Sequence, residues 1–195
     1  EMFPTYIDAG AVEDMSSYVT DEDKKEYKYL SNGNMMDGQY GWPLVTGVPF
    51  VLYYNEDILN ALGEKAPETW DDFARICQEA TKDTDGDGKV DQYGFACGMN
   101  TSDIGAMQIL NAYYYSALWQ NGGQVYNDDL KSVSFADEAG KEAVTWLKGL
   151  TSYMNEDFMS LSWSDAFSNV FGAGKAAFGI TRSSQTDGTT FAETY

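Results

Sequence analysis

The sequence predicts an α/β fold, in which helices pack against a sheet. Short apolar runs typical of buried strands occur at 48–54, 93–97 and 176–180, and segments with helical periodicity separate them. No tight hairpin signal of the Asn-Gly type lies between two alternating runs. Strands that alternate with helices in this way are typical of α/β layers.

The composition indicates a folded, strongly acidic protein. The 195 residues include 12 Lys+Arg, 31 Asp+Glu and no histidine, which gives a net charge of −19. Hydrophobic residues make up 43% and aromatic residues 15%, enough for a core, so the acidic excess belongs on the surface. Such a surface repels phosphate backbones and anionic headgroups, which excludes nucleic acid and a lipid surface as partners and favours neutral or cationic ligands. The lack of histidine removes Ser/His and Cys/His nucleophiles and His-rich zinc sites.

The most clearly marked helix begins at Trp70. Thr69 and Asp72 have the spacing of a capping box, with Asp in place of Glu or Gln. The apolar residues then recur at i, i+3, i+4 and i+7, which places one stripe on a core: Phe73, Ile76, Cys77 and Ala80.

Four other helices are expected. The first covers about 20–30, and the second carries Ile104, Met107, Leu110, Tyr114 and Leu118 and ends at Gly122 and Gly123. The third runs from Asp137 to Leu150 with Ala143, Val144, Leu147 and Leu150 inward, and the fourth runs from Ser164 to Phe171 and stops at Gly172. Helical spacing makes Tyr114 and Leu118 core neighbours, and because a buried Tyr or Trp is the commoner case, Tyr113 to Tyr115 and Trp119 are left out of the candidate site. The tail 181–195 is polar and lacks periodicity.

Five segments in order resemble one known family. They are DGQYGWPLVTG (37–47), VLYYNEDIL (51–59), APETWDDFARICQEATKDTDGDGKVDQYGF (66–95), LWQNGGQVY (118–126) and FGAGKAAFGI (171–180). Together they resemble the extracellular solute-binding proteins of sugar ABC importers, the class that includes the maltose-binding protein. The resemblance covers nearly the whole chain, but only the middle of such a protein.

The resemblance implies a periplasmic-binding-protein-like (type II) lobe, with helices on a mixed, mostly parallel sheet. Residues 1–49 then correspond to the end of the first lobe's opening segment, and residues 50–195 to the second lobe. The implied function is reversible binding of a mono- or oligosaccharide between two lobes that close by a hinge motion, followed by delivery to the permease subunits of the transporter. No enzymatic activity is expected. The implied location is extracellular, as a cell-surface lipoprotein or a free periplasmic protein, with membrane contact only through a lipid anchor or the permease.

The resemblance also places candidate ligand residues in three segments. Family members present polar side chains to the ligand in the turn after the 93–97 strand, near the interlobe crossing, and after the 176–180 strand; the matching residues are Asn100, Thr101, Ser102, Asp103, Thr46, Arg182, Ser183 and Ser184. Thr101 or Ser102 would equally cap the next helix. Many relatives have a sugar-stacking Trp after the last strand, whereas this chain has no aromatic residue at 181–184. Arg182 is the alternative there, as a bidentate donor to hydroxyls or an acidic sugar, or as a solvated turn residue.

An Asp/Gly loop has part of the pattern of a calcium loop. Asp83, Asp85, Asp87, Lys89 and Asp91 match positions 1, 3, 5, 7 and 9, but position 12 is Gly94 where an EF-hand has a bidentate Glu. Either a weak calcium site or a plain turn fits this pattern, and no cofactor is required for the expected function. Cys77 and Cys97 fit either a disulfide or two buried thiols.

Two other functions fit parts of the sequence. A glycoside hydrolase needs only two carboxylates, but none here lies in an obvious acid or nucleophile motif. A calcium-dependent carbohydrate-binding module would use the Asp83 loop, but such modules are mostly β-sandwiches, and the amphipathic helices argue against one.

Overall fold

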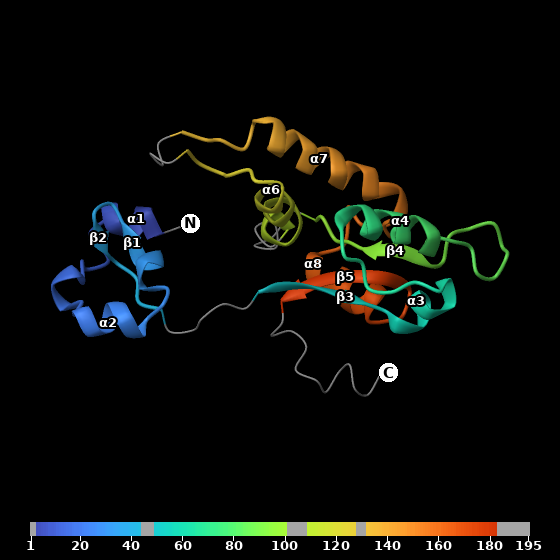
Figure 1. Ribbon diagram of the computed structural model, residues 1–195, viewed down its shortest axis with the longest axis horizontal. Helices are drawn as coiled ribbons and strands as arrows, with labels where there is room; N and C mark the ends of the chain where they lie inside the picture. Colours follow the sequence, from blue (N-terminus) through green and yellow to red (C-terminus); the bar gives the residue numbers. More distant parts are fainter. Residues whose placement is uncertain (1–2, 44–48, 101–108, 128–131, 183–195) are drawn as a thin grey trace. The chain divides into compact units, whose positions relative to one another are not determined.

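The computed structural model describes residues 3–43, 49–100, 109–127 and 132–182, and the chain divides into two compact units (Figure 1). Unit 1 is Glu1–Val48 and unit 2 is Pro49–Tyr195. The division falls beside Pro49, next to the boundary expected from the sequence. Each unit is described by itself.

Unit 1 consists of short helical segments and one small hairpin. The helical segments are α1 (Phe3–Asp8), α2 (Asp21–Glu26) and two 3-10 turns, η1 (Ser16–Tyr18) and η2 (Leu30–Gly33). The helix expected over 20–30 therefore ends at Glu26. It starts with a capping box, in which the Thr20 side chain accepts from the Asp23 backbone N–H and the Asp23 carboxylate accepts from the Thr20 N–H.

Unit 1 contains a tight hairpin for which the sequence carries no Asn-Gly signal. Strands β1 (Asn34–Met35) and β2 (Gly38–Gln39) pair antiparallel around Met36 and Asp37, which both have positive φ. Two left-handed central residues are typical of a type I′ turn, but Met is not a residue that signals one. Contacts distant in sequence hold the turn instead, because the Asp14 carboxylate accepts from the Gln39 backbone N–H at 3.0 Å and Gln39 Nε2 donates to the Leu30 carbonyl.

Unit 2 contains a mixed three-stranded sheet. Its strands are β3 (Phe50–Tyr54), β4 (Tyr93–Ala96) and β5 (Ala176–Arg182), in the order β3-β5-β4. Strand β3 pairs antiparallel with β5, with Phe50 opposite Arg182. Strand β4 pairs parallel with β5, with Phe95 opposite Phe178. The three apolar runs in the sequence are therefore the three strands, as predicted.

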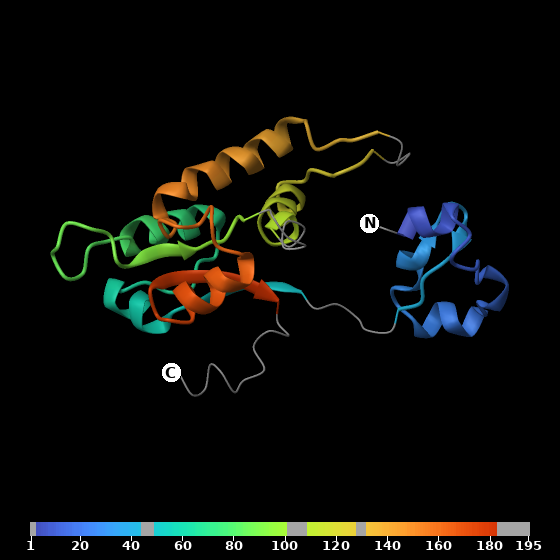
Figure 2. The same ribbon diagram turned by 180° about the vertical axis from the view of Figure 1, so that it is seen from behind.

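Helices cover both faces of this sheet, so the α/β prediction is confirmed. Figure 2 shows the arrangement from behind. The helical segments in chain order are α3 (Glu56–Leu62), α4 (Trp70–Ala80), the π-helical η3 (Leu110–Tyr115), α6 (Ser116–Gln120), α7 (Glu138–Leu150), the 3-10 turn η4 (Thr151–Tyr153), α8 (Trp163–Ala166) and the π-helical η5 (Phe167–Phe171). The capping box at Thr69 is present, and the predicted stripe of α4 is buried.

The core on the α4 face is aromatic. Phe73 of α4 lies 4.8 Å from Phe178 of β5 and 5.5 Å from Phe95 of β4, measured between ring centres. On the opposite face, Phe167 and Phe171 of η5 form a second cluster with Ala96 and Ala176. Because residues alternate along a strand, the neighbouring residues Phe95 and Ala96 of β4 pack into different clusters.

The prediction that Val144 faces the core is wrong. Val144 is 53% exposed, whereas Ala143 and Leu150 are buried and Trp146 and Leu147 are partly buried. Adjacent residues of a helix point about 100° apart, so a face centred on Ala143 and Leu147 leaves Val144 beyond its edge.

Candidate ligand-binding site

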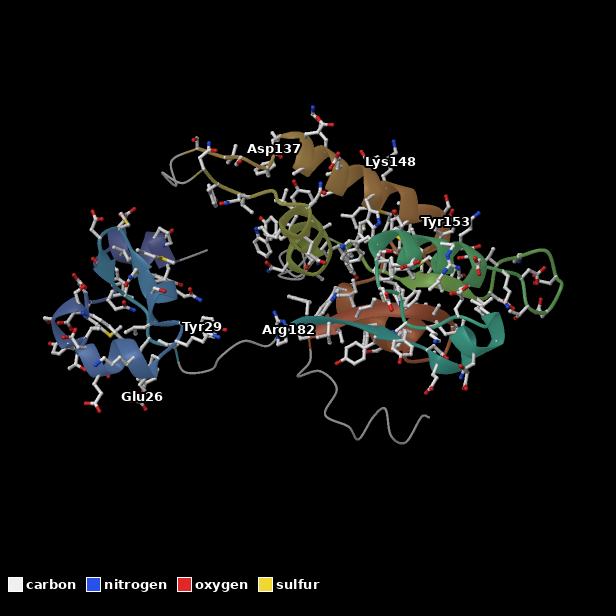
Figure 3. The ribbon with its side chains drawn as sticks, in the orientation of Figure 1. Glu26, Tyr29, Asp137, Lys148, Tyr153 and Arg182 are labelled. Atoms are coloured by element: carbon white, nitrogen blue, oxygen red, sulfur yellow. The ribbon has the colours of Figure 1, made fainter. Side chains whose placement is uncertain are left out.

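The candidate site lies at the edge of the unit 2 sheet where β4 and β5 end and β3 begins. The two parallel strands place their carboxyl ends at the same edge, and the register sets Phe50 of β3 opposite Arg182 of β5. Figure 3 labels Arg182 at this end of the sheet. In open α/β sheets, ligands bind outside the carboxyl ends of the strands.

The loop after β4 is held in place by the segment 154–161. Asn155 is 1% exposed, and its Oδ1 accepts from the Cys97 backbone N–H at 2.9 Å. The Asn100 N–H donates to the Leu161 carbonyl at 2.9 Å, and Asn100 Nδ2 donates to the Ser160 carbonyl at 3.0 Å. The Asn100 side chain therefore anchors this loop at the end of β4.

Arg182 lies against two aromatic rings. Its guanidinium carbon is 5.8 Å from the ring centre of Phe50 and 5.9 Å from that of Trp163, which is within cation–π range. The two rings meet edge to face at 5.6 Å, and the buried Trp163 donates its Nε1–H to the Ile180 carbonyl. Within the residues that the structure describes, Arg182 forms no ion pair. It is thus a half-buried cation fixed by aromatic packing.

The end of β5 and its aromatic neighbour differ from what the sequence predicts. The polar tail was expected to begin at residue 181, but Thr181 and Arg182 are the last residues of β5, and Thr181 is fully buried. The aromatic residue that sequence reasoning missed beside Arg182 is Trp163, which comes from α8. Its sequence position gives no signal, because only tertiary packing brings α8 to this strand end.

The other predicted ligand residues lie outside the described part of the chain. These are Thr46, Thr101, Ser102, Asp103, Ser183 and Ser184. The structure thus places Asn100 and Arg182 in the same unit, at the ends of the neighbouring strands β4 and β5.

A cavity of about 310 Å³ lies beside this edge in unit 2. It is bounded by β3, the start of α4 and the η3–α6 segment, through residues that include Phe50, Glu68, Thr69, Trp70, Ser116 and Gln120. Trp70 Nε1 donates to Gln120 Oε1 at 3.1 Å, which ties the two walls together. Of the two predicted ligand residues in the described part of the chain, neither Asn100 nor Arg182 lines this cavity.

The Asp/Gly loop brings three carboxylates together. Oxygens of Asp83, Asp85 and Asp91 lie within 4.8 Å of one another. The loop also satisfies these groups internally, since Asp83 accepts from the Gly86 and Gly88 N–H groups and Asp91 accepts from the Thr84 hydroxyl. Hydrogen bonds, from the Gly88 N–H above all, lower the pKa of Asp83, and those from Thr84 lower the pKa of Asp91. Asp87 accepts from the Lys89 N–H in the same loop.

The twelfth loop position cannot complete a calcium shell. Gly94 belongs to β4, and a Cβ at this residue would overlap the backbone of Cys77 in α4. A glutamate therefore has no room where an EF-hand needs its bidentate ligand. The donors present fit an incomplete oxygen shell, and the loop's own hydrogen bonds account for its geometry.

Both cysteines are free thiols. Cys77 and Cys97 are buried in the core around Phe73, and no disulfide joins them. Burial raises the pKa of Cys97 to about 12 and raises the pKa of Cys77 further above its usual range. Such thiols pack as small apolar side chains.

The comparison with known families identifies the chain. The family described as bacterial extracellular solute-binding protein matches residues 1–193, and the chain belongs to this family. A curated binding protein of Brucella abortus is 28% identical over 189 residues, which cover 90% of this chain and 41% of the relative. A binding protein of Brucella suis matches with the same identity and coverage.

Solved structures show the same fold. An ABC transporter solute-binding protein of Thermotoga lettingae bound with alpha-D-tagatose has a TM-score of 0.69 at 19% identity, covering 91% of this chain and 44% of that one. The maltose/maltodextrin-binding domain MalE of Bdellovibrio bacteriovorus, bound to maltotriose, has a TM-score of 0.66 at 16% identity, covering 91% and 43%. A solute-binding protein of Agrobacterium radiobacter in complex with ribitol has a TM-score of 0.62 at 20% identity, covering 90% and 43%. The periplasmic-binding-protein-like fold predicted from the sequence is confirmed.

The chain spans less than half the length of these relatives. It covers 41% of the curated proteins and 43–44% of the three structures. Among the residues that the structure describes, no helix is both long and apolar enough to cross a membrane.

Proposed function

We propose that this protein is the substrate-binding component of a carbohydrate ABC importer, which binds a sugar without covalent chemistry and delivers it to the permease. The observation that carries the proposal is the Arg182 guanidinium held by Phe50 and Trp163 at the ligand-binding edge of the sheet. Membership of the solute-binding family and the tagatose, ribitol and maltotriose in the similar structures support it.

This arrangement suits a polyhydroxylated ligand. Sugars present C–H faces that pack on aromatic rings and hydroxyls that pair with polar side chains. A guanidinium carries five N–H donors in a planar fork, so Arg182 can donate to two neighbouring hydroxyl oxygens at once. Packing against the rings limits its rotamers before the ligand arrives, which reduces the entropy lost on binding.

The proposed ligand contacts come from two strand ends and the interlobe crossing. The proposed set contains Asn100 and Arg182. It also contains residues outside the described part of the chain: Thr46, Thr101, Ser102, Asp103, Ser183 and Ser184. The first lobe closes over this edge of the second lobe by a hinge motion, and the permease recognises the closed form. The protein acts outside the cytoplasmic membrane, as a lipid-anchored or a periplasmic protein.

The ligand response of the full-length protein tests the proposal. A sugar that binds only the native state raises the melting temperature. Arg182→Ala should abolish most of this rise, because it removes the donors at the strand end. The matched control is Arg75→Ala, since Arg75 is a surface residue paired with Glu64 and Glu79, and its loss should leave the sugar response intact. A full-length protein that hydrolyses chromogenic glycosides, or whose melting temperature no mono- or oligosaccharide changes, would contradict the proposal.

Binding needs no cofactor in this proposal, and the Asp83 loop is a structural turn. We expect 1 mM calcium to leave the melting temperature of the 195-residue chain within error of its value in EDTA. Asp85→Asn should behave like the parent protein in both conditions. A calcium-dependent rise that Asp85→Asn removes would show instead that the loop holds the ion.

A further inference from the structure

A single segment, residues 154–163, contacts both strand ends of the ligand edge. Its first residue, Met154, forms a parallel bridge with Phe95 of β4. The ring centre of its last residue, Trp163, lies 5.9 Å from the guanidinium carbon of Arg182 at the end of β5. This segment therefore helps to set the positions of both the loop after β4 and Arg182.

The side chain of Asn155 continues the contact with β4 beyond that bridge. Asn155 Oδ1 accepts from the Cys97 N–H at 2.9 Å, and Asn155 Nδ2 donates to Asp157 Oδ1 at 2.7 Å. Each end of the amide has a partner of the matching kind, and these partners assign its orientation. Asn155 is 1% exposed and Cys97 is fully buried, so the amide supplies a hydrogen bond that the Cys97 N–H cannot obtain from water.

The loop 98–100 is attached to the same segment. The Met99 N–H donates to the Phe158 carbonyl at 2.6 Å. Gly98 packs directly on the segment, because a Cβ at this residue would overlap the Ser162 carbonyl. The loop and the segment therefore lie in contact along their length, with no room for either to shift alone.

Ser162 also joins this loop to Arg182. It caps α8, where its Oγ accepts from the Asp165 N–H at 3.1 Å. The next residue is Trp163, whose ring packs on the Arg182 guanidinium. A displacement of the loop at Gly98 would therefore shift the start of α8 and, through Trp163, the guanidinium.

We infer that Asn155 is a positioning residue for the ligand edge: without touching the ligand, it holds the loop 98–100 on the segment 154–163 and so fixes Asn100 relative to Arg182. Its burial keeps it out of reach of the ligand, so it acts through the loop. This inference rests on the proposed function and names a residue that sets the geometry of its site.

Amide hydrogen exchange of the 195-residue chain, followed by NMR, tests whether Asn155 holds the loop. Asn155→Ala should lower the protection of the Met99 and Asn100 amides about tenfold relative to the amides of α4, because an unpaired buried N–H weakens the attachment. The matched control is Asn55→Ala. Asn55 is also a buried asparagine whose Oδ1 accepts from a backbone N–H, that of Ile58, but it lies at the opposite end of β3. Its loss should expose the Ile58 amide and leave the loop protected.

Titration calorimetry of the full-length protein tests the effect on binding. The probes are tagatose, ribitol and maltotriose, with any sugar that raises the melting temperature of the parent. At a temperature where each variant is folded, Asn155→Ala should raise the Kd about tenfold, whereas Asn55→Ala should leave it within about twofold. The exposed Asp157 allows a milder variant, because Asp157→Ala removes only the acceptor that orients Asn155 and should raise the Kd about threefold. A purely structural role would lower the melting temperature of both asparagine variants without separating their Kd values.

Equal Kd changes in Asn155→Ala and Asn55→Ala would reduce Asn155 to a structural residue. Unchanged protection of the Met99 and Asn100 amides in Asn155→Ala would show that the loop is held without this side chain. Either result sinks this inference alone if Arg182→Ala still removes the sugar response. A parent protein that binds no sugar overturns the positioning role together with the proposed function.

Discussion

Different kinds of interaction stabilise the interior of unit 1 and the interior of unit 2. Within the described part of unit 1, Leu30 is the one large apolar side chain that is buried. The hairpin of unit 1 is held by hydrogen bonds from Gln39 to the Asp14 carboxylate and to the Leu30 carbonyl. Unit 2 has apolar clusters on both faces of its sheet. Buried apolar area is the main source of folding free energy, so unit 2 should carry most of the stability. The proposed ligand edge lies on this rigid sheet, which fixes Arg182 before any ligand binds.

The largest expected effect comes from the centre of the unit 2 core. Phe178 is fully buried between Phe73 and the neighbouring strands, so Phe178→Ala should lower the free energy of unfolding by ~3–5 kcal/mol. Leu30→Ala in unit 1 is the matched control. It should leave the unit 2 transition, followed by tryptophan fluorescence in urea, unchanged. A loss at Leu30 equal to that at Phe178 would mean that the two units unfold together.

Two glycines of unit 2 should respond in opposite directions. Gly94→Ala places a Cβ against the Cys77 backbone and should cost ~1–3 kcal/mol from overpacking. Gly149 lies in α7 with open space around it, so Gly149→Ala should stabilise by ~0.5–1 kcal/mol. Urea midpoints of the two variants measure the difference. Equal effects would show that α4 does not pack on β4 as described.

The two capping boxes allow the same substitution in each unit. Thr69→Ala should lower the free energy of unfolding of unit 2 by ~1 kcal/mol, because α4 loses its N-cap, whereas Thr20→Ala should leave the unit 2 transition unchanged.

Hydrogen bonds from Thr69 and Thr20 lower the pKa values of Asp72 and Asp23. The stability that these bonds give is therefore present above the carboxyl pKa of the unfolded chain, and it is lost as pH falls through the folded value. An acid titration of unfolding in the Thr69→Ala variant should show a smaller decline than in the parent.

The smallest effect concerns alkaline pH and the core of unit 2. Burial raises the thiol pKa of Cys97 to about 12, so the folded protein keeps this proton while the unfolded chain loses it. Stability is thus complete below the unfolded pKa and declines as pH rises towards the folded value, by ~0.8 kcal/mol per thiol at pH 9. Cys97→Ala should remove the contribution of this thiol to the fall of stability with rising pH. Native Cys77 and Cys97 should resist alkylation at pH 8, and rapid labelling of either would show that the core opens.

Local patterns in the sequence predicted much of unit 2. The stripe on α4, the cap at Thr69, the three strands and the left-handed Gly122 after α6 are all present, because each depends on neighbours within a few residues. The same reasoning failed for Val144, because the helical period alone does not say how wide a buried face is. It also missed the hairpin at Met36 and Asp37, which is held by residues far away in sequence.

The sequence by itself determined the α/β class, the family, the acidic surface and the order of the helices and strands. Only the tertiary structure decided which side chains share the ligand edge, because strand register sets Phe50 opposite Arg182 and the packing of α8 brings Trp163 to them. The same holds for the cavity, whose walls at Trp70 and Gln120 are 50 residues apart along the chain. Contacts of that range depend on how whole elements pack, and no local spacing encodes them.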